Sequence, residues 1–237
     1  MASDSPRPTF RHERKAAERG IGIICGIDEA GRGPWAGPVV AAAVILDPAR
    51  LPRGVNDSKV LEPERREALY HIIMERAEVG VGIIDVERID AINILQATFA
   101  AMADAVLALA RQPAYAFVDG NRAPKLPCET KTIIDGDAKC MSIAAASIIA
   151  KVTRDRLMVA LDALWPCYGF ARHKGYGTPE HQDALRRLGP CVHHRRSFAP
   201  IRACLAGEAI VADTTLTLSY ELDSPRTPSD SQCGSEK

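Results

Sequence analysis

The chain has 237 residues, of which 46% are hydrophobic and 25% charged, and its formal net charge is zero. These values are typical of a folded globular protein and exclude a chain that is disordered throughout. No apolar run approaches the ~20 residues that cross a bilayer, and the polar N-terminus does not resemble a secretory signal, so we expect a cytoplasmic protein without membrane association.

The zero net charge conceals an uneven distribution along the chain. Residues 122–202 contain 14 Lys and Arg against 7 Asp and Glu, whereas residues 206–237 contain 2 against 6. A basic half can bind a polyanion, while an acidic tail cannot. Chance unevenness is the alternative explanation.

The first half of the domain reads as strands joined by turns. Residues 1–20 are charged and are predicted to be a disordered extension. Apolar runs predict buried strands at residues 22–28 and 39–46, separated by a Gly/Pro loop at residues 30–38. Because this loop has no room for a crossover helix, we expect the two strands to be antiparallel.

Helices and strands alternate after residue 60. We predict helices over residues 63–77, 88–110 and 140–164, a helix beginning at Thr178, and strands over residues 79–86, 115–119 and 130–134. This order predicts one α/β domain around a mixed sheet, spanning residues 21–205. The acidic, Ser/Thr/Pro-rich segment 206–237 is expected to be a disordered tail.

Carboxylates follow two of the predicted apolar strands. Asp28 and Glu29 end the first, and Asp119 ends the fourth. Asp135 and Asp137 lie just before the long helix. Acids that converge from separate strand ends repel one another unless cations lie between them, and Mg²⁺ prefers oxygen ligands. A site for two divalent cations is the functional interpretation, and solvated acids in surface turns are the alternative.

The glycine loop permits two interpretations. Residues 31–36 satisfy the pattern G-x-G-x-x-[G/A] of dinucleotide-binding loops, but that pattern must open a helix, and here a strand follows. We therefore favour a loop whose backbone closely approaches a sugar–phosphate chain and offers N–H donors to it.

Three further clusters are candidates for substrate contacts. Residues 56–59 form a polar loop, residues 173–178 place Tyr176 between glycines beside basic residues, and residues 193–196 are either phosphate-binding or structural. An Asx turn and a core tyrosine are the structural alternatives for the first two. On the long helix, three polar residues share a face that could form a phosphate track: Ser147, Lys151 and Arg154. An ordinary ion pair with Lys151 is favoured for Asp155.

Six ordered segments between residues 22 and 202 resemble bacterial ribonuclease HII. They are GIDEAGRGP (26–34), NDSK (56–59), VDGNR (118–122), SIAAASIIAKVTRD (142–155), HKGYGT (173–178) and HRRSF (194–198). The resemblance implies a ribonuclease H-like fold, with a five-stranded mixed sheet flanked by helices and C-terminal helical elements. It also implies a monomeric endonuclease that cuts the RNA strand of RNA–DNA hybrids and incises duplex DNA at embedded ribonucleotides during ribonucleotide excision repair. The expected products carry 5′-phosphate and 3′-hydroxyl ends.

The resemblance also assigns roles to residues. It implies two Mg²⁺ or Mn²⁺ ions held by the catalytic acids Asp28, Glu29, Asp119 and Asp137. It implies that Gly31, Arg32 and Gly33 read the 2′-hydroxyl at the RNA–DNA junction, and that Tyr176 stacks on the sugar on the DNA side. The remaining expected substrate contacts are Ser58, Lys59, Ser147, Lys151 and Arg154.

Two positions depart from the family pattern. Asp135 stands where the family has Lys, and its carboxylate could share a strand face with Asp137 and alter metal affinity. Trp35 is bulkier than the expected residue. A non-catalytic nucleic-acid-binding domain is the rival hypothesis, which the four acids oppose because unneutralised carboxylates weaken polyanion binding.

Overall fold

The computed structural model describes residues 7–208. Its α-helices and strands are α1 (Arg11–Glu18), β1 (Ile24–Ala30), β2 (Val39–Leu46), α2 (Pro63–Arg76), β3 (Ala77–Ile84), α3 (Val86–Leu107), β4 (Tyr115–Asp119), β5 (Glu129–Ile133), α4 (Met141–Leu164), α5 (Phe170–His173), α6 (Pro179–Leu188) and α7 (Ala199–Leu205). Short 3-10 helices, η1 (Gly136–Ala138) and η2 (Pro166–Tyr168), flank α4. The segment predicted to be an acidic tail lies outside the described residues from position 209 onward.

The five strands form one mixed sheet in the order β3-β2-β1-β4-β5. β1 pairs antiparallel with β2, as the short loop between them predicted, and β2 pairs antiparallel with β3. β4 lies parallel to both β1 and β5. The parallel pairing of β1 and β4 is possible because α3 returns the chain across the sheet between β3 and β4.

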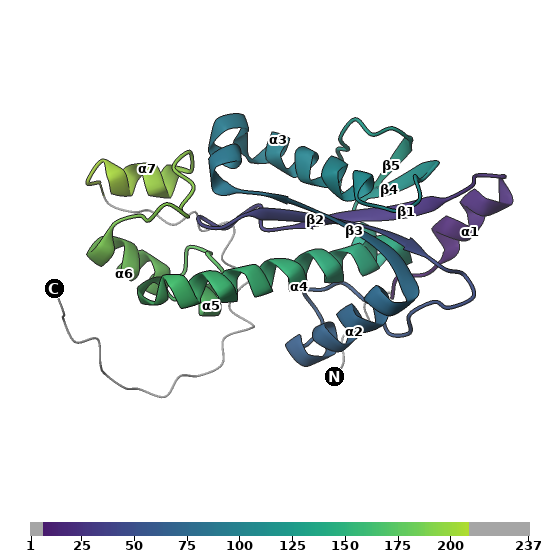
Figure 1. Ribbon diagram of the computed structural model, residues 1–237, viewed down its shortest axis with the longest axis horizontal. Coiled ribbons are helices and arrows are strands. Elements are labelled where there is room, and N and C mark those ends of the chain that lie inside the picture. Colours follow the sequence, from purple (N-terminus) through teal and green to yellow (C-terminus); the bar gives the residue numbers. More distant parts are fainter. Residues whose placement is uncertain (1–6, 209–237) are drawn as a thin grey trace.

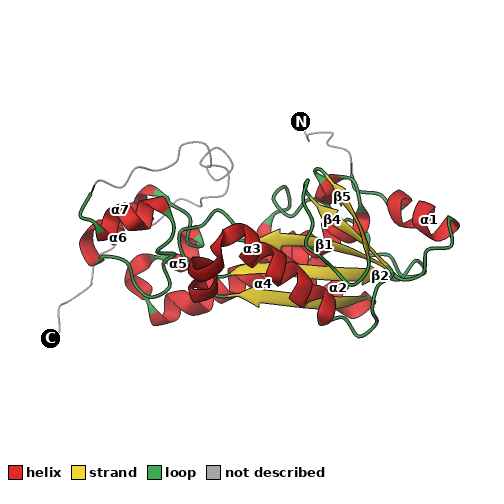
Figure 2. Ribbon diagram, turned by 90° about the horizontal axis from the view of Figure 1, so that it is seen from above, coloured by secondary structure: helices red, strands yellow, loops and turns green. Residues whose placement is uncertain are grey.

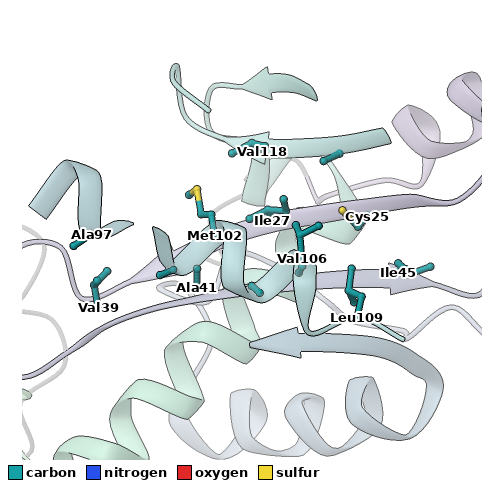
Figure 3. Packing of buried hydrophobic residues seen from close by; sticks show 14 of the residues in the cluster. Cys25, Ile27, Val39, Ala41, Ile45, Ala97, Met102, Val106, Leu109 and Val118 are labelled. Atoms are coloured by element: carbon teal, nitrogen blue, oxygen red, sulfur yellow. The ribbon is translucent and has the colours of Figure 1, made fainter. Parts of the chain in front are cut away.

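Helices cover both faces of the sheet. α3 lies on one face, and α2 and α4 lie on the other (Figure 1). β2 is buried throughout because its side chains alternate between two cores: Val39 and Ala41 pack toward α3, while Ala42 and Val44 pack toward α4. Figure 3 shows the first of these cores between α3 and the sheet. Burial on both faces explains why this strand reads as a continuous apolar run.

Helix α3 is interrupted near its start. Asn93 adopts φ 66° and ψ 163°, and its side-chain oxygen accepts hydrogen bonds from the N–H groups of Leu95 and Gln96. Residues other than glycine rarely adopt this combination of φ and ψ, and Asn93 adopts it where it caps the longer segment that follows, so the predicted single helix is two. Among the described helices, α3 alone has the length and apolar composition of a membrane span, and its buried side chains pack on the sheet.

The prediction that residues 1–20 are disordered is wrong from residue 7 onward. α1 packs beside the start of α4, and the carboxylate of Glu13 accepts hydrogen bonds from Ser142 N–H (2.8 Å) and Cys140 Sγ (3.1 Å). Thr9 forms a parallel bridge with Cys140. The charged composition concealed this docking because α1 buries only one edge, through Glu13 and Ala16.

The C-terminal helices lie beyond one end of the sheet, and α1 lies at the other (Figures 1 and 2). Trp35, in the loop after β1, is buried in a cluster with Leu185 of α6 and Ile201 of α7. The glycine loop therefore connects the sheet to the C-terminal helices.

Candidate active site

Strand register brings Asp28 and Asp119 to the same edge of the sheet. In the parallel pairing of β1 with β4, Ile27 lies opposite Val118, so the next residues, Asp28 and Asp119, lie side by side just past the last pair of this register. The Asp28 side chain is buried and its Oδ1 accepts the N–H of Glu29 at 2.7 Å. Two carboxylates therefore meet at the carboxyl ends of adjacent parallel strands, where functional residues gather in α/β sheets.

Asp137 reaches this edge from the turn between β5 and α4. The adjacent Gly136 donates its N–H to Asp119 Oδ1 at 2.7 Å, which ties η1 to the end of β4. An added Cβ at Gly136 would lie 2.6 Å from Ile143 Cδ1 and 3.1 Å from Asp119 Oδ1, so glycine permits this close approach. The third segment is thereby fixed beside the first two.

The carboxylates act on one another electrostatically. Burial raises the pKa of Asp28 well above its usual value, and repulsion from the other three predicted acids raises it further. Burial also raises the pKa of Glu29, against the attraction of Arg32, whose Nη1 lies 3.2 Å from Glu29 Oε1. Asp28 is thus the centre of a single acidic cluster.

A fifth carboxylate, which the sequence analysis did not select, lies beside Asp137. Burial raises the pKa of Asp137 to about 6, with repulsion from Asp57 and Asp119 contributing and Lys59 opposing. Asp57 Oδ1 also accepts the N–H of Lys59 at 2.8 Å, as in the Asx turn considered for this loop. The polar loop at residues 56–59 was the signal that could have identified it.

Lys59 contacts the cluster at Asp137, as Arg32 does at Glu29. Its ammonium lies 3.6 Å from Asp137 Oδ2, and its side chain is largely exposed. Desolvation opposes its charge, but attraction to Asp57, Asp137 and the other acids outweighs that effect and raises the pKa of Lys59. Lys59 and Arg32 together cannot neutralise the five carboxylates, so an excess of negative charge is left there.

The cluster fits divalent cations by charge and donor type. Carboxylate oxygens are hard ligands, and a cation between them would remove the repulsion that raises the pKa of Asp28. Within residues 7–208, no group of three or more His, Cys, Asp or Glu side chains is already arranged as a metal-binding cluster.

The glycine loop follows β1 directly. Gly31 has φ +94°, and an added Cβ there would lie 2.0 Å from Arg154 Nε. Arg32 is exposed and pairs with Glu29, and Gly33 is half-buried. β2 begins at Val39, so the structure places a strand after this loop, which excludes the dinucleotide-binding interpretation.

The predicted phosphate track on α4 does not face solvent. Ser147 is buried and its hydroxyl lies 2.7 Å from that of Ser58, which ties the loop at residues 56–59 to the helix. Arg154 is buried as well and donates to backbone carbonyls. Lys151 is half-buried and pairs with Asp155 at 3.0 Å, which confirms the ordinary helix ion pair. The spacing placed these residues on one face, but that face packs inward.

The segment at residues 193–196 is mostly structural. His194 and Arg195 are fully buried, while Arg196 is exposed. Arg195 contacts the glycine loop, which agrees with the structural alternative for this segment, although the sequence did not indicate which segment it would contact. Tyr176 is half-buried, and its carbonyl lies 2.8 Å from His181 Nδ1.

The two departures from the family pattern have local explanations. Asp135 adopts φ 52°, is exposed, and pairs with Lys139 at 3.5 Å. Trp35 fits because Gly177 has no side chain: an added Cβ there would lie 2.1 Å from the indole ring. The expected sharing of a strand face by Asp135 and Asp137 is wrong, since neither residue lies in a strand.

Sequence comparisons agree with this geometry. Residues 25–201 match the family model Ribonuclease HII. Ribonuclease HII of Azorhizobium caulinodans is 60% identical over 195 residues, covering 82% of this chain and 75% of that protein. Ribonuclease HII of Parvibaculum lavamentivorans is 58% identical over 200 residues, covering 84% of this chain and 74% of that protein.

Solved structures are similar over most of the chain. The ribonuclease H2 of Pyrococcus horikoshii has a TM-score of 0.67 at 27% identity and covers 78% of this chain and 98% of its own. The RNase HII of Archaeoglobus fulgidus, solved in complex with PCNA, has a TM-score of 0.62 at 29% identity. The match covers 73% of this chain and 94% of that chain. Bst-RNase HIII in complex with Mn²⁺ is only 21% identical and, with a TM-score of 0.62, shares the fold. These likenesses confirm the expected ribonuclease H-like fold.

Proposed function

Because this chain belongs to the ribonuclease HII family, whose members are hydrolytic endoribonucleases that cleave the RNA of RNA–DNA hybrids, we propose that it also incises duplex DNA at single embedded ribonucleotides. The observation that carries this proposal is the acidic cluster at the ends of β1 and β4, beside a glycine loop suited to approach by a sugar–phosphate backbone.

We assign the acids to a pair of divalent cations, Mg²⁺ or Mn²⁺. The ligands would be Asp28, Glu29, Asp119 and Asp137. Two such cations activate a water molecule for attack on phosphorus and stabilise the leaving oxygen. The chain itself holds Asp119 in place through Gly136 N–H and keeps Lys59 beside Asp137. Hydrolysis of the bond between the scissile phosphorus and the 3′-oxygen would release a 3′-hydroxyl end and leave the phosphate on the 5′ end of the other product.

Substrate recognition is assigned to two loops. Backbone N–H groups of Gly31, Arg32 and Gly33 would read the 2′-hydroxyl, the group that separates RNA from DNA. Tyr176 would stack on the neighbouring deoxyribose. Lys59, largely exposed beside the acids, would contact a phosphate.

The other expected contact residues act indirectly in this proposal. The hydrogen bond between Ser58 and Ser147 holds the loop that carries Lys59 against α4. Lys151 forms an ion pair within α4, and Arg154 donates to the Pro38 carbonyl at the end of the glycine loop. We further propose that the protein acts as a cytoplasmic monomer in ribonucleotide excision repair, without membrane attachment.

A duplex with one ribonucleotide tests the proposal. We expect cleavage with Mg²⁺ or Mn²⁺ and none in EDTA, and end analysis should find 5′-phosphate. Asp119→Asn should lose activity by more than the roughly 10- to 100-fold cost of disturbing an outer-shell metal partner. It should still bind the duplex and fold, because asparagine keeps an oxygen for Gly136 N–H. Absence of cleavage with both metals would contradict incision at single ribonucleotides.

A further inference from the structure

The guanidinium of Arg195 is buried under the glycine loop. It donates to the carbonyls of Gly31 (2.6 Å), Arg32 (2.9 Å), Gly37 (2.8 and 3.0 Å) and Pro38 (3.2 Å). The side chain is 0% exposed. Its five N–H donors in a fixed fork suit several carbonyls at once, which the single ammonium of lysine does not.

These bonds determine the direction of two N–H groups. In a planar trans peptide, the carbonyl and the N–H of the same unit point in opposite directions. A Gly31 carbonyl directed at Arg195 therefore directs the N–H of Arg32 away from it. In the same way, the Arg32 carbonyl directs the N–H of Gly33 away. Two of the three donors proposed to read a 2′-hydroxyl, the N–H groups of Arg32 and Gly33, are therefore oriented by a residue that does not touch the substrate.

A second buried arginine joins this loop to the loop that carries Tyr176. Arg154 donates to the carbonyls of Ala36 (3.1 Å), Pro38 (2.9 Å) and Lys174 (3.0 Å). Backbone bonds reinforce the junction, since Trp35 N–H donates to Gly175 O at 2.8 Å. The two neighbouring buried arginines, Arg154 and Arg195, therefore hold the backbone of the glycine loop, and Arg154 also holds that of the Tyr176 loop.

Burial makes the positive charge of Arg195 energetically unfavourable, as its pKa shows. Burial, with the like charge of Arg154, lowers the pKa of Arg195 to about 9, and Tyr176 acts in the opposite direction. The phenol of Tyr176 thus lies within electrostatic reach of the guanidinium. A buried cation is costly unless its donors are satisfied, so the loop carbonyls must stay in place around it.

We propose that Arg195, supported by Arg154, is a positioning residue that sets the discrimination between ribose and deoxyribose. It holds the Gly31–Arg32 and Arg32–Gly33 peptides so that their N–H groups point away from the protein interior. This inference rests on the proposed reading of the 2′-hydroxyl by the loop backbone. It assigns to the two arginines a specificity role and no contact with the substrate.

Binding in the Asp119→Asn background tests it, because the duplexes are then not cut. Affinities are measured for two duplexes of one sequence, all-DNA and with a single ribonucleotide. The ratio of interest is the dissociation constant of the all-DNA duplex divided by that of the duplex with one ribonucleotide. Adding Arg195→Lys should reduce this ratio about tenfold, the effect of roughly one well-formed hydrogen bond. Affinity for the all-DNA duplex should stay within about twofold, since phosphate contacts are unchanged.

The neighbouring Arg196→Lys is the matched control, because this exposed arginine should leave the ratio unchanged. Arg154→Lys should also lower the ratio, and it replaces Arg195→Lys as the test variant if Arg195→Lys does not fold. An unchanged ratio in a folded Arg195 variant, equal losses on both duplexes, or failure of both variants to fold would overturn the positioning role. Equal affinities in the background protein itself would instead overturn the proposed 2′-hydroxyl reading.

Discussion

At the scale of single residues, backbone conformation separates the two aspartates that flank Gly136. Asp135 has a left-handed backbone, and its exposed carboxylate pairs with Lys139. Asp137 is buried in η1 beside Lys59. Two residues of spacing would place both on one face of a strand, but the turn points them to different surroundings.

We therefore expect the same substitution, aspartate to asparagine, to reduce cleavage strongly at position 137 and to leave it nearly unchanged at position 135. Asp137→Asn should reduce cleavage by more than about 100-fold, because it removes a charge from the acidic cluster. Asp135→Asn should keep activity within about twofold, since asparagine tolerates a positive φ and the lost ion pair is exposed. Steady-state cleavage of a hybrid measures both. Equal losses would show that Asp135 belongs to the site.

Local patterns in the sequence indicated Asp28, Glu29 and Asp119, whereas the resemblance to ribonuclease HII selected Asp137, and neither indicated the neighbours of these acids. Asp28 and Asp119 were found because each ends an apolar strand, a pattern that is visible along the chain. Asp57 and Arg195 lie in polar segments where a functional carboxylate or a buried guanidinium looks like any solvated residue. Their roles come from contacts with segments about 80 and 160 residues away, as in the Asp57–Asp137 and Arg195–Gly31 pairs.

At the scale of elements, glycines in strands allow helices to lie close to the sheet. An added Cβ at Gly26 of β1 would lie 2.2 Å from the backbone carbon of Ser142 in α4. Gly80 and Gly82 of β3 have the same relation to α3, with backbone carbonyls 2.0 Å from the added Cβ. Backbone atoms cannot move aside as a flexible side chain does, so these positions exclude any larger residue.

Gly26→Ala should therefore destabilise the protein. Displacing α4 from the sheet should lower the free energy of unfolding by about 1–3 kcal/mol, or more. Gly22→Ala is the matched control because its added Cβ meets only Ala114 Cβ, at 3.9 Å, and it should change stability by less than about 0.5 kcal/mol. Urea denaturation of both variants gives the comparison. Equal stabilities would show that α4 adjusts without cost.

Helix α1 is attached through a buried carboxylate. Glu13→Ala should lower the free energy of unfolding by about 1–3 kcal/mol, because Ser142 N–H would lose its acceptor in the interior. Glu18→Ala, at an exposed position of the same helix, should have an effect below about 0.5 kcal/mol. Thermal or urea unfolding measures the difference. If the two variants are equally stable, the docking of α1 contributes nothing to the fold.

At the scale of the whole molecule, a histidine network joins the C-terminal helices to the Tyr176 loop. His181 Nδ1 lies 2.8 Å from the Tyr176 carbonyl and must donate, so His181 Nε2 accepts from His194 Nε2 at 2.9 Å. His194 Nδ1 then accepts the N–H of Cys191 at 3.0 Å. Each ring has one donor and one acceptor, which requires both histidines to be neutral.

Acid should therefore weaken the fold. Burial lowers the pKa of His181 to about 3 and that of His194 to about 4, below the value of 6.5 for the unfolded chain. As the pH falls below 6.5, the unfolded chain takes up protons that the folded protein does not. Stability that is fully present above about pH 7 is then lost toward pH 4.

For His181 alone, we expect a loss of about 2 kcal/mol between pH 7 and pH 5. Urea denaturation at both pH values should show this loss in the parent and a smaller one in His181→Gln. Comparing variant with parent cancels the contributions of other titrating groups. His71→Gln, an exposed position, should keep the parent's pH dependence. The same pH dependence in His181→Gln as in the parent would contradict the network's role.

The sequence by itself determined the strands, the antiparallel start of the sheet and the long α4 helix, and it indicated Asp28 and Asp119 as carboxylates at the ends of neighbouring strands. Each of these depends on local patterns: apolar runs, loop length, and carboxylates placed after strands. The tertiary structure alone decided that α1 is ordered, that the polar face of α4 turns inward, and that Arg154 and Arg195 lie beneath the recognition loops. Burial of a charge depends on acceptors contributed by distant segments, and the composition of the segment that carries the charge does not reveal them.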